Sequence, residues 1–520
     1  FELGRPYQVY YGSGGGTNIA DNAAAQFVNE QSALYIQDEI YVANHDLTLN
    51  IGLRYEWIES DDTPAYNSTL SNTVGVRNDA GLDGVDLLMP RVGFTWGARD
   101  NLTLRGGLGL YSGGDPNVWV ANAWSRDGLT QVQVREVYRN AASIFDGSLP
   151  TISGPVGGAI PQVLFDEIAA ISGTAGSDED SVLISPSYKQ PREWKYALGA
   201  TWDTGLWDIT ADIDFMYTRL VDSALYTDLS QQQVGTTLAG TPIYGPKPGA
   251  GENNLMLTNA ADTATGSVFS VVLQKDFDWG LDLLLGYAYT DVDDVSPMTS
   301  FTAESSSTNL ATNDINTPVA GRSQYSVRDR VTLRASYARE FWGDNTTRFT
   351  LMGYYGSGQP TTYVMTSEGE LTVNEDFRST PLYVPSGPND PNVIFADGFD
   401  QSGFFSFVQA NGLAPGFVSR NGAESKHNSR LDLRIDQEIP LYFDDLKARA
   451  FLKIYNFSNM LNDDWGRQHD DPFFSAGVVD IEVDDSGAFI FNTFDPEDTT
   501  DLETFSSLWE IRMGLEVNFR

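Results

Sequence analysis

The chain consists of long segments in which apolar and polar residues alternate, joined in turn by short and by very long connections. Residues 47–57 show this best, because Leu, Leu, Ile, Leu, Tyr and Trp alternate there with Thr, Asn, Gly, Arg and Glu. Side chains alternate across a β-strand, so this segment has one apolar and one polar face. A tilted strand of about 11 residues covers the roughly 25 Å apolar band of an outer membrane. The pattern therefore predicts an all-β protein, an antiparallel transmembrane β-barrel.

Short turns with Asp, Asn or Gly join these segments into pairs, as tight connections require. The first pairs are residues 34–42 with 47–57, and 89–97 with 102–111. With the final segment 509–519, the pairs amount to about 13 spanning strands, whereas single-chain bacterial barrels have even strand numbers. The odd number indicates that the barrel contains further strands. The remaining short turns lie at 203–205, 276–278, 343–345 and 442–445.

Long polar stretches, to which no regular structure is assigned, separate the pairs. Bacterial barrels have short periplasmic turns and long extracellular loops, so these stretches are predicted to lie outside the cell. Aromatic residues at both ends of the strands, such as Tyr111 and Tyr287 beside long loops and Trp279 beside a short turn, indicate two membrane-interface girdles. The long stretches are 58–88, 112–190, 219–267, 291–324, 358–428 and 458–507.

Charge and composition narrow the classes of function. Asp and Glu number 71 against 32 Lys and Arg, and a net charge of -39 would repel nucleic acid. The chain has no cysteine, which excludes disulfides and thiolate metal sites. Apolar runs are far shorter than the roughly 20 residues of a membrane helix. Loop carboxylates such as Asp178, Glu179 and Asp180 fit a solvated surface, with a loop-bound divalent cation as the alternative.

The sequence offers little for catalysis. Its histidines, His45, His427 and His469, fall in different turns or loops, and no zinc-protease or nucleophile-elbow motif occurs. His469 with Asp470 and Asp471 could bind a metal, although an exposed loop cluster has the same composition. We therefore expect no enzyme, no catalytic residue, and no cofactor apart from that possible cation.

Four segments carry a resemblance to a known family: residues 35–57, 90–114, 429–440 and 454–462. With these, the chain resembles the C-terminal part of the β-barrel of TonB-dependent outer-membrane transporters, nearest to the Oar-like branch. The resemblance implies a 22-stranded barrel closed by an N-terminal plug and energised by the TonB complex. Residues 1–520 would then be one barrel domain with long extracellular loops, while the plug, the first strands and the TonB contact lie in a missing N-terminal region.

An alternative remains open, in which a further strand near residues 8–11 completes a barrel of roughly 14 strands. Such a barrel would be a passive porin, or a structural or adhesive protein. In the transporter interpretation, by contrast, extracellular loops bind a ligand that passes through the plugged barrel with energy from the TonB complex.

The end of the chain resembles the signal read by the bacterial barrel-assembly machinery. The residues that carry it are Arg512, Gly514, Val517 and Phe519, although Arg520 follows the terminal aromatic residue. The expected location is the bacterial outer membrane, and the expected partners include this machinery, outer-membrane lipid and lipopolysaccharide.

Aromatic residues in the long loops are the candidates for ligand contact. Acidic loops with scattered aromatics favour a peptide, a protein or a cation-bearing small ligand over a highly anionic one. The alternative is that the aromatics pack the loops against one another. The candidates are Trp119, Trp124, Tyr138, Phe404, Phe405, Phe407 and Trp465.

Overall fold

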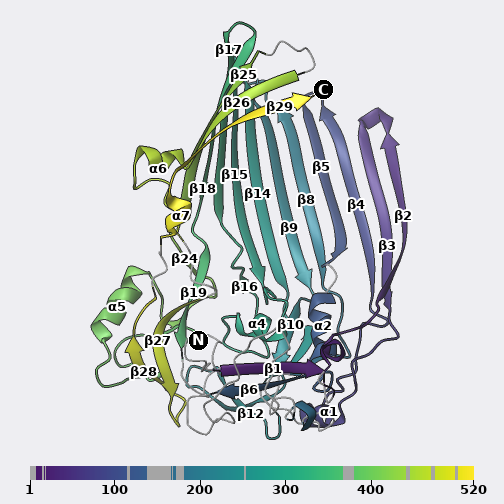
Figure 1. Ribbon diagram of the computed structural model, residues 1–520, viewed down its shortest axis with the longest axis vertical. Coiled ribbons are helices and arrows are strands. Elements are labelled where there is room, and N and C mark those ends of the chain that lie inside the picture. The colour runs from purple at the N-terminus through teal and green to yellow at the C-terminus, as the bar shows by residue number, and fades with distance from the viewer. Residues whose placement is uncertain are drawn as a thin grey trace.

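A large antiparallel sheet, curved into an open trough, dominates the computed structural model of the chain (Figure 1). The sheet has 14 strands, and without the two-residue β16 (Gly321–Arg322), which pairs only with β15, the remaining 13 form one continuous path. Consecutive strands of the path are neighbours, so the predicted number and order of spanning strands are confirmed. The structure describes residues 8–14, 17, 19–113, 117–137, 166, 168–170, 181–250, 253–366, 380–440, 446–469, 475–497 and 502–519.

The strands of this path are here called the wall, and short turns join them in pairs. The turns that the structure describes lie at one end of the sheet in Figure 1. The turn between the first two strands is the 3-10 helix Ala43–His45, which ends at Asp46 in the left-handed region with φ 47°. The wall strands are β2 (Glu30–Val42), β3 (Leu47–Glu59), β4 (Asp86–Arg99), β5 (Leu102–Ser112), β8 (Arg192–Asp203), β9 (Thr210–Val221), β14 (Ala264–Asp276), β15 (Leu281–Asp294), β17 (Asp329–Trp342), β18 (Asn345–Gly356), β25 (Asn428–Ile439), β26 (Leu446–Tyr455) and β29 (Glu510–Phe519).

The register of the wall keeps the two faces of every strand separate. Residues directly opposite one another lie on the same face. Leu285 pairs with Leu333, which pairs with Gly353, and this row continues to Leu431. We call this apolar side the lipid face. The opposite side, which we call the luminal face, carries Arg54, Asp212 and Arg434, as the alternation predicts.

Several residues depart from the simple division, and Asp38 and Tyr111 are two of them. Asp38 pairs with Ile51, so a carboxylate lies within the lipid face of β2. Tyr111, expected among the girdle aromatics, pairs with Glu193 on the luminal face, where the Arg91 guanidinium lies 5.7 Å from the centre of its ring. The girdle therefore includes Tyr287 and Tyr355, which belong to one lipid-face row, but not Tyr111.

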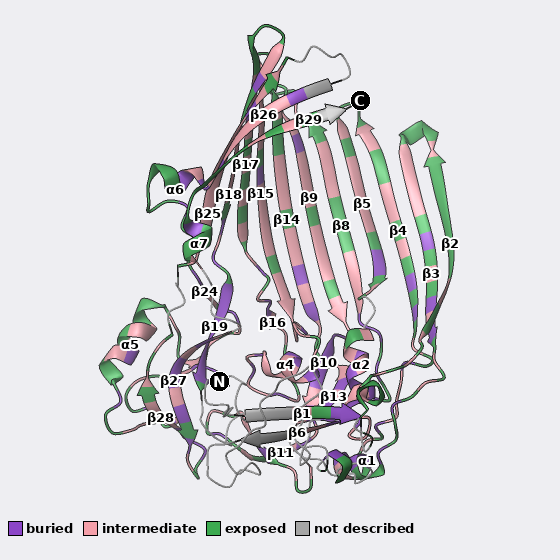
Figure 2. Ribbon diagram, viewed as in Figure 1, coloured by how far each residue is buried: buried purple, intermediate pink, exposed green. Residues whose placement is uncertain are grey.

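The long connections are folded, which the sequence interpretation did not anticipate. The connections and the stretch before β2 contain helices and short strands, and the most deeply buried side chains of the described residues lie in the connections (Figure 2). The helices are α1 (Ser68–Val74), α2 (Asn117–Ser125), α4 (Ala303–Thr308), α5 (Gln401–Ala410), α6 (Phe457–Leu461) and α7 (Thr504–Ser507), with the 3-10 helix Ala20–Ala23. The strands are β1 (Gln8–Gly14), β6 (Gln131–Val137), β7 (Ser181–Ile184), β10 (Ala224–Asp228), β11 (Gln231–Thr236), β12 (Pro242–Pro246), β13 (Asn254–Asn259), β19 (Pro360–Thr366), β20 (Thr380–Pro381), β21 (Tyr383–Val384), β22 (Val393–Phe395), β23 (Gly416–Phe417), β24 (Ala423–Glu424), β27 (Ser475–Val483) and β28 (Phe489–Phe494).

Two hydrophobic cores hold the connections together at the end of the trough opposite the short turns. The buried residues of the first loop core run from Ile58, at the end of β3, to Ala303, at the start of α4, and include Trp124, Tyr226 and Leu257. The second loop core joins the last two long stretches and is rich in phenylalanine, with Phe404, Phe489 and others. The expectation of structureless polar loops is therefore wrong, because apolar residues far apart in sequence meet in these cores.

A buried polar cluster fastens the second loop core to the end of the wall. The Arg420 guanidinium forms an ion pair with Asp294 at 2.8 Å and donates to backbone carbonyls beside it, including that of Val295. Arg322, on β16, forms an ion pair with Glu424 at 2.7 Å. Both arginine side chains are less than one tenth exposed, so the contact between the second loop core and the wall is buried.

The two outermost strands of the wall do not meet. Among the described residues, β2 has only β3 as a neighbour and β29 has only β26. A strand does form where the porin alternative requires one, but β1 pairs with β6 beside the loop cores, not with the wall. No helix in the described part of the chain has the length and hydrophobicity needed to span a membrane.

Candidate functional site

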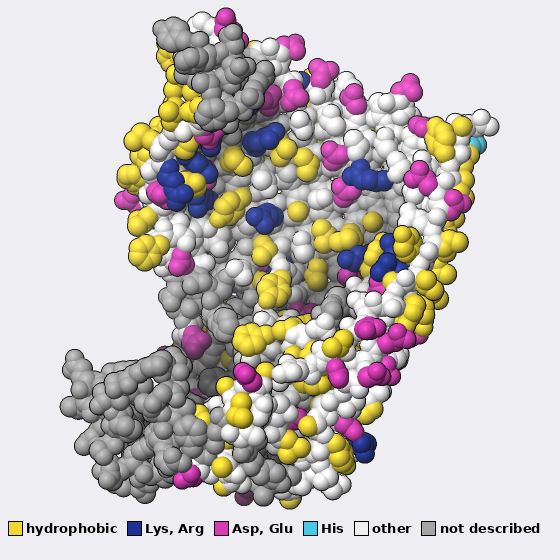
Figure 3. Space-filling view, turned by 45° about the vertical axis from the view of Figure 1, so that its right-hand side comes forward, with side chains coloured by type: hydrophobic (Ala, Val, Ile, Leu, Met, Phe, Trp, Pro, Cys, Tyr) yellow, Lys and Arg dark blue, Asp and Glu magenta, His cyan; other side chains and the backbone are white. Residues whose placement is uncertain are grey.

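The luminal face presents charged side chains along the wall (Figure 3). In one cluster, Arg105 forms an ion pair with Asp214 at 2.7 Å, and its other nitrogen donates to Thr201. The Thr201 hydroxyl in turn donates to Asp212 at 2.6 Å. Because these side chains are partly exposed, such pairs stabilise the fold only weakly and can exchange partners with a bound molecule.

A second cluster joins the last three wall strands. Arg434 contacts Asp436 at 2.7 Å and Glu516 at 3.2 Å, and Arg449 contacts the same two carboxylates. Asp436 is only 5% exposed. The two arginines therefore provide ion-pair partners for the buried carboxylate of Asp436, which lies on the luminal face.

Between the two clusters, β17 and β18 present uncompensated positive charge. Arg330, Arg334 and Arg348 share the luminal face and are exposed. None of them forms an ion pair with any residue that the structure describes. Arg330 lies instead 6.0 Å from the centre of the Tyr354 ring. The middle of the luminal face can thus bind anionic groups, although the chain as a whole is strongly acidic.

A cavity of about 600 Å³ opens on the other side of the wall, at the loop end of β17, β18 and β25. Its floor is the lipid face, with Val331, Leu333 and Leu431. Gly353 lies in the same row, and a Cβ atom there would come within 2.5 Å of Leu431. The missing side chain at this position therefore lets Leu431 lie flat across β18 and leaves room above it.

The other rim of the cavity comes from the segment between β26 and β27. This rim supplies Asp464, Trp465, Arg467 and His469, and Lys426 and His427 precede β25. Trp465 is 56% exposed. The His427 ring lies 5.2 Å from the Tyr355 ring. The sequence separated His427 from His469, but the structure brings both to this one cavity.

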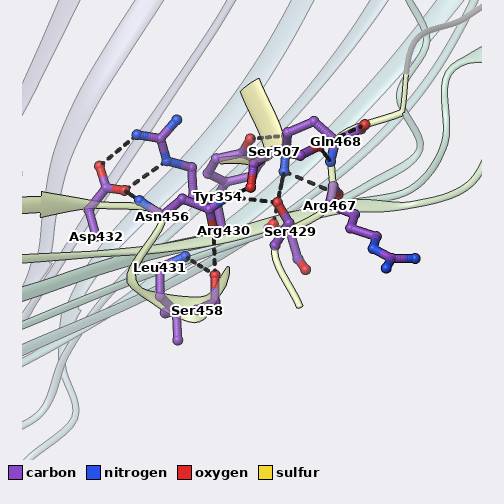
Figure 4. A network of polar contacts seen from close by, with 11 residues as sticks. Tyr354, Ser429, Arg430, Leu431, Asp432, Asn456, Ser458, Arg467, Gln468 and Ser507 are labelled. Atoms are coloured by element: carbon purple, nitrogen blue, oxygen red, sulfur yellow. Dashed lines mark hydrogen bonds and ion pairs between the residues drawn. The ribbon is translucent and has the colours of Figure 1, made fainter. Parts of the chain in front are cut away.

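A polar network positions this rim against the edge of β25 (Figure 4). β26 stops pairing with β25 at Leu433, so the backbone beyond that point needs other partners. Ser458 Oγ accepts from the Leu431 amide at 3.3 Å, and Gln468 Nε2 donates to the Ser429 carbonyl at 3.0 Å. The Tyr354 hydroxyl donates to Gln468 at 2.7 Å.

Asn456 holds the start of this segment. It has φ 48° and is fully buried. Its side-chain amide donates to the carbonyls of Gly466 and Ser507 at 2.9 and 2.8 Å, and its backbone amide donates to Asp432. One asparagine thus ties α6, the cavity rim and α7 together.

The structure separates the predicted ligand-contact aromatics. Trp124 is buried in the first loop core, and Trp119 packs against that core from α2. Phe404 is fully buried in the second loop core, with Phe405 and Phe407 against it. The contacts that these five residues make are those of the alternative interpretation, in which the aromatics pack the loops against one another.

Trp465 stands apart from that group, because it is exposed beside the cavity. Tyr138, Asp470 and Asp471 lie outside the described residues. Contact with a ligand stays a prediction for every one of these side chains. Among the described residues, no group of three or more His, Asp or Glu side chains is arranged to hold a metal ion.

The residues of the assembly signal all lie on β29. Arg512 is on the luminal face and forms an ion pair with Glu510 at 2.6 Å. Gly514 lies beneath the Phe451 ring, where a Cβ atom would come within 2.6 Å of ring carbons. Val517 is in register with Ala448 on the lipid face, and the backbone of Phe519 is in register with that of Leu446. Recognition by the assembly machinery stays a prediction.

Residues 3–463 match the family model described as the outer membrane beta barrel domain. The chain belongs to this family. The protein is accordingly a β-barrel protein of the bacterial outer membrane, in which the lipid face of the wall meets the hydrocarbon. A search of curated proteins found no significant match.

Solved structures with a similar fold include three barrels of low sequence identity. The outer membrane transporter YddB from Escherichia coli is 11% identical with a TM-score of 0.43, and the match covers 94% of this chain and 45% of the YddB chain. The FrpB iron transporter from Neisseria meningitidis (F3-3 variant) is 11% identical with a TM-score of 0.41, at the same coverage. The siderophore receptor PirA from Acinetobacter baumannii is 12% identical with a TM-score of 0.39, and covers 83% and 42%. The chain spans less than half the length of each.

Proposed function

We propose that this chain forms part of the barrel wall and the extracellular loops of a TonB-dependent receptor and transporter. In this proposal the folded loops bind a ligand outside the cell, and a plug, moved by the TonB complex, opens a path along the luminal face. The assignment to the Oar-like branch rests on the sequence resemblance alone. The proposal assigns no catalysis and no cofactor to the chain.

The observation that supports the proposal best is the open wall. Unpaired backbone groups cost several kcal/mol each in a bilayer, so the edges of β2 and β29 need strand partners in the membrane. Since β1 pairs with β6, it is not the strand that joins the two edges. We propose that further strands close the barrel, and that a plug fills the lumen that they complete.

The luminal arginines support transport over a purely structural role. A packed barrel interior would leave exposed cations such as Arg334 and Arg348 unsatisfied. A water-filled or plugged lumen leaves them solvated or gives them partners. Loops with cores of their own add a second feature expected of a receptor, because binding residues are often carried by loops held on a rigid scaffold.

Conductance of the intact protein in planar bilayers tests the proposal, with KCl as the probe. A plugged transporter should show no steady current, whereas a passive porin should conduct. The purified periplasmic domain of TonB should bind the intact protein. A steady open current together with no binding to this domain would overturn the proposal.

Cysteine pairs placed along the outer edges of β2 and β29 test closure separately. In the proposed barrel these two strands are separated by other strands, so no disulfide should form between them. Efficient disulfide formation in cell membranes would show direct pairing and support the small porin instead.

A further inference from the structure

We infer that the cavity lined by Trp465 binds the headgroup of an anionic, phosphate-bearing lipid of the outer leaflet. The inference rests on the charge of the cavity lining, on its height along the wall and on its continuity with the lipid face. It does not depend on TonB-driven transport, because any barrel of this family has lipid against the same face.

The lining reverses the charge balance of the whole chain. Lys426, Arg430 and Arg467 line the cavity, against the single carboxylate of Asp464. Arg430 is paired with Asp432 at 2.7 Å on the luminal face, so Lys426 and Arg467 are the cations of the rim that a ligand could reach. Acidic residues outnumber basic ones by 71 to 32 in the sequence, so this local excess of cations stands out. Lys426 forms no ion pair with any described residue, and both it and Arg467 are exposed. Ammonium and guanidinium groups in this setting suit a phosphate.

The cavity lies at the height of a membrane interface. Tyr287, Val331, Tyr355 and Ser429 form one row across four wall strands, and the last three line the cavity. Tyrosine and tryptophan collect where headgroups meet the hydrocarbon. Trp465 lines the same cavity from the opposite rim and is exposed. Lipid phosphates therefore reach the level at which Lys426 and Arg467 are exposed.

The floor of the cavity continues into the apolar surface of the wall. Below the tyrosine row comes the row of Leu333, Gly353 and Leu431, and then that of Ala335, Leu351 and Leu433. An acyl chain can lie along these two rows while its headgroup stays in the cavity. A free phosphate ion would use only the cationic rim, so this apolar continuation favours a lipid as the occupant.

Lipid retention by the intact protein tests the inference. The protein is folded into vesicles of phosphatidylcholine with one tenth lipid A, extracted gently into detergent, and examined by native mass spectrometry. We expect lipid A to be retained in excess over its share of the vesicle. The double variant Lys426→Gln/Arg467→Gln should reduce this excess by about fivefold for each cation removed.

A matched control removes two cations elsewhere in the loops. Lys189 is exposed, and Arg77 pairs with Asp79 much as Arg467 pairs with Asp464. Lys189→Gln/Arg77→Gln should retain lipid A as the native protein does. Equal loss in both double variants, or no loss in the first, would overturn the inference. Folding of each variant is checked by the heat-dependent mobility shift of the barrel in gels.

A competition experiment distinguishes lipid from free phosphate. Inorganic phosphate at tens of millimolar should leave retained lipid A unchanged, because it lacks the acyl contacts with the Leu333 and Leu351 rows. Trp465→Ala should lower retention without removing charge. Complete displacement by inorganic phosphate, with native retention in Trp465→Ala, would show a simple anion site and contradict the lipid assignment.

Discussion

Single residues on the wall have different consequences according to the face they occupy. Leu351 lies between Ala335 and Leu433 on the lipid face, so its surroundings are wholly apolar. Arg334 lies one strand away on the luminal face, exposed and without an ion pair among the described residues. The chemistry of the two positions is fixed by the pleat of the strands, since neighbours on one strand alternate between faces.

The first prediction compares these two residues. Leu351→Arg should destabilise the barrel by about 2–4 kcal/mol, because it places a charge in hydrocarbon, whereas Arg334→Gln should cost much less. The measurement is urea-dependent folding of the intact protein into phosphatidylcholine vesicles. Equal destabilisation by the two variants would mean that the faces are assigned wrongly.

Ile51 makes a sharper comparison, because Asp38 lies directly opposite on β2. A new arginine at position 51 could pair with that carboxylate. Ile51→Arg should therefore cost less than Leu351→Arg, and the difference should disappear in the double variant Ile51→Arg/Asp38→Asn. A cost at position 51 that is independent of Asp38 would contradict the strand register.

At the scale of elements, the segment from α6 to the cavity rim depends on few contacts. Asn456 begins it in the left-handed region, which asparagine tolerates better than most residues. Its two side-chain donors satisfy carbonyls that would otherwise be buried without partners. A short segment thus obtains a fixed shape from one buried amide.

The second prediction concerns this amide. Asn456→Gly keeps the backbone conformation accessible but removes both hydrogen bonds that the side-chain amide donates and the one that its oxygen accepts from Ser458, and should destabilise the segment by about 2–3 kcal/mol. Hydrogen exchange of the amides of residues 457–469 should accelerate, while exchange in β18 stays unchanged. Asn462→Ala, at an exposed position, is the control. Unchanged exchange in Asn456→Gly would show that the segment is held by other contacts.

The turn before β22 should respond to pH through Asp390. Burial alone would raise the pKa of this carboxyl, but hydrogen bonds from the amides and side chains of Ser386 and Asn392 hold its pKa below the usual value. A carboxyl with a lowered folded-state pKa stabilises the fold above its unfolded pKa, about 4. This contribution is lost as pH falls through the folded-state pKa.

The third prediction follows from that sign. Between about pH 5 and pH 3, exchange of the amides of residues 386–393 should accelerate more in the native protein than in Asp390→Asn, whose side chain does not titrate. Comparing the two proteins at each pH cancels the intrinsic pH dependence of exchange. The same acceleration in both proteins would mean that other carboxyls control the turn.

At the scale of the whole molecule, the wall and the folded loops divide the protein into two ends. The short turns that the structure describes lie at one end and both loop cores at the other (Figure 1). In bacterial barrels the short turns face the periplasm. The cavity beside Trp465 would then lie near the outer interface of the membrane.

The fourth prediction tests this orientation with single cysteines, which is simple because the chain has none. Ser402→Cys on α5 should react in whole cells with a membrane-impermeant maleimide. Asp344→Cys, in the turn between β17 and β18, should react only after the outer membrane is opened. Both positions are exposed in the structure. The opposite labelling pattern would reverse the topology.

The sequence alone determined the wall: its strand order, its short turns and the face of each strand. These features are local, because a period of two residues is imposed by the strand and by the lipid on one side of it. Even the placement of Arg54, Asp212 and Arg434 on the luminal face follows from counting along the chain. The last wall strand, Glu510–Phe519, was visible for the same reason.

Only the tertiary structure decided what lies beyond the strands. The loop cores join residues such as Trp124 and Leu257, or Phe404 and Phe489, whose separations carry no period that a sequence could reveal. The same holds for the cavity, which Lys426, His427 and Arg467 line together. β25 extends beyond the residues that pair with β26, and the segment after β26 forms hydrogen bonds with this unpaired part of β25. Contacts of this kind depend on which distant segments pack together, and the alternation of polar and apolar residues does not encode that choice.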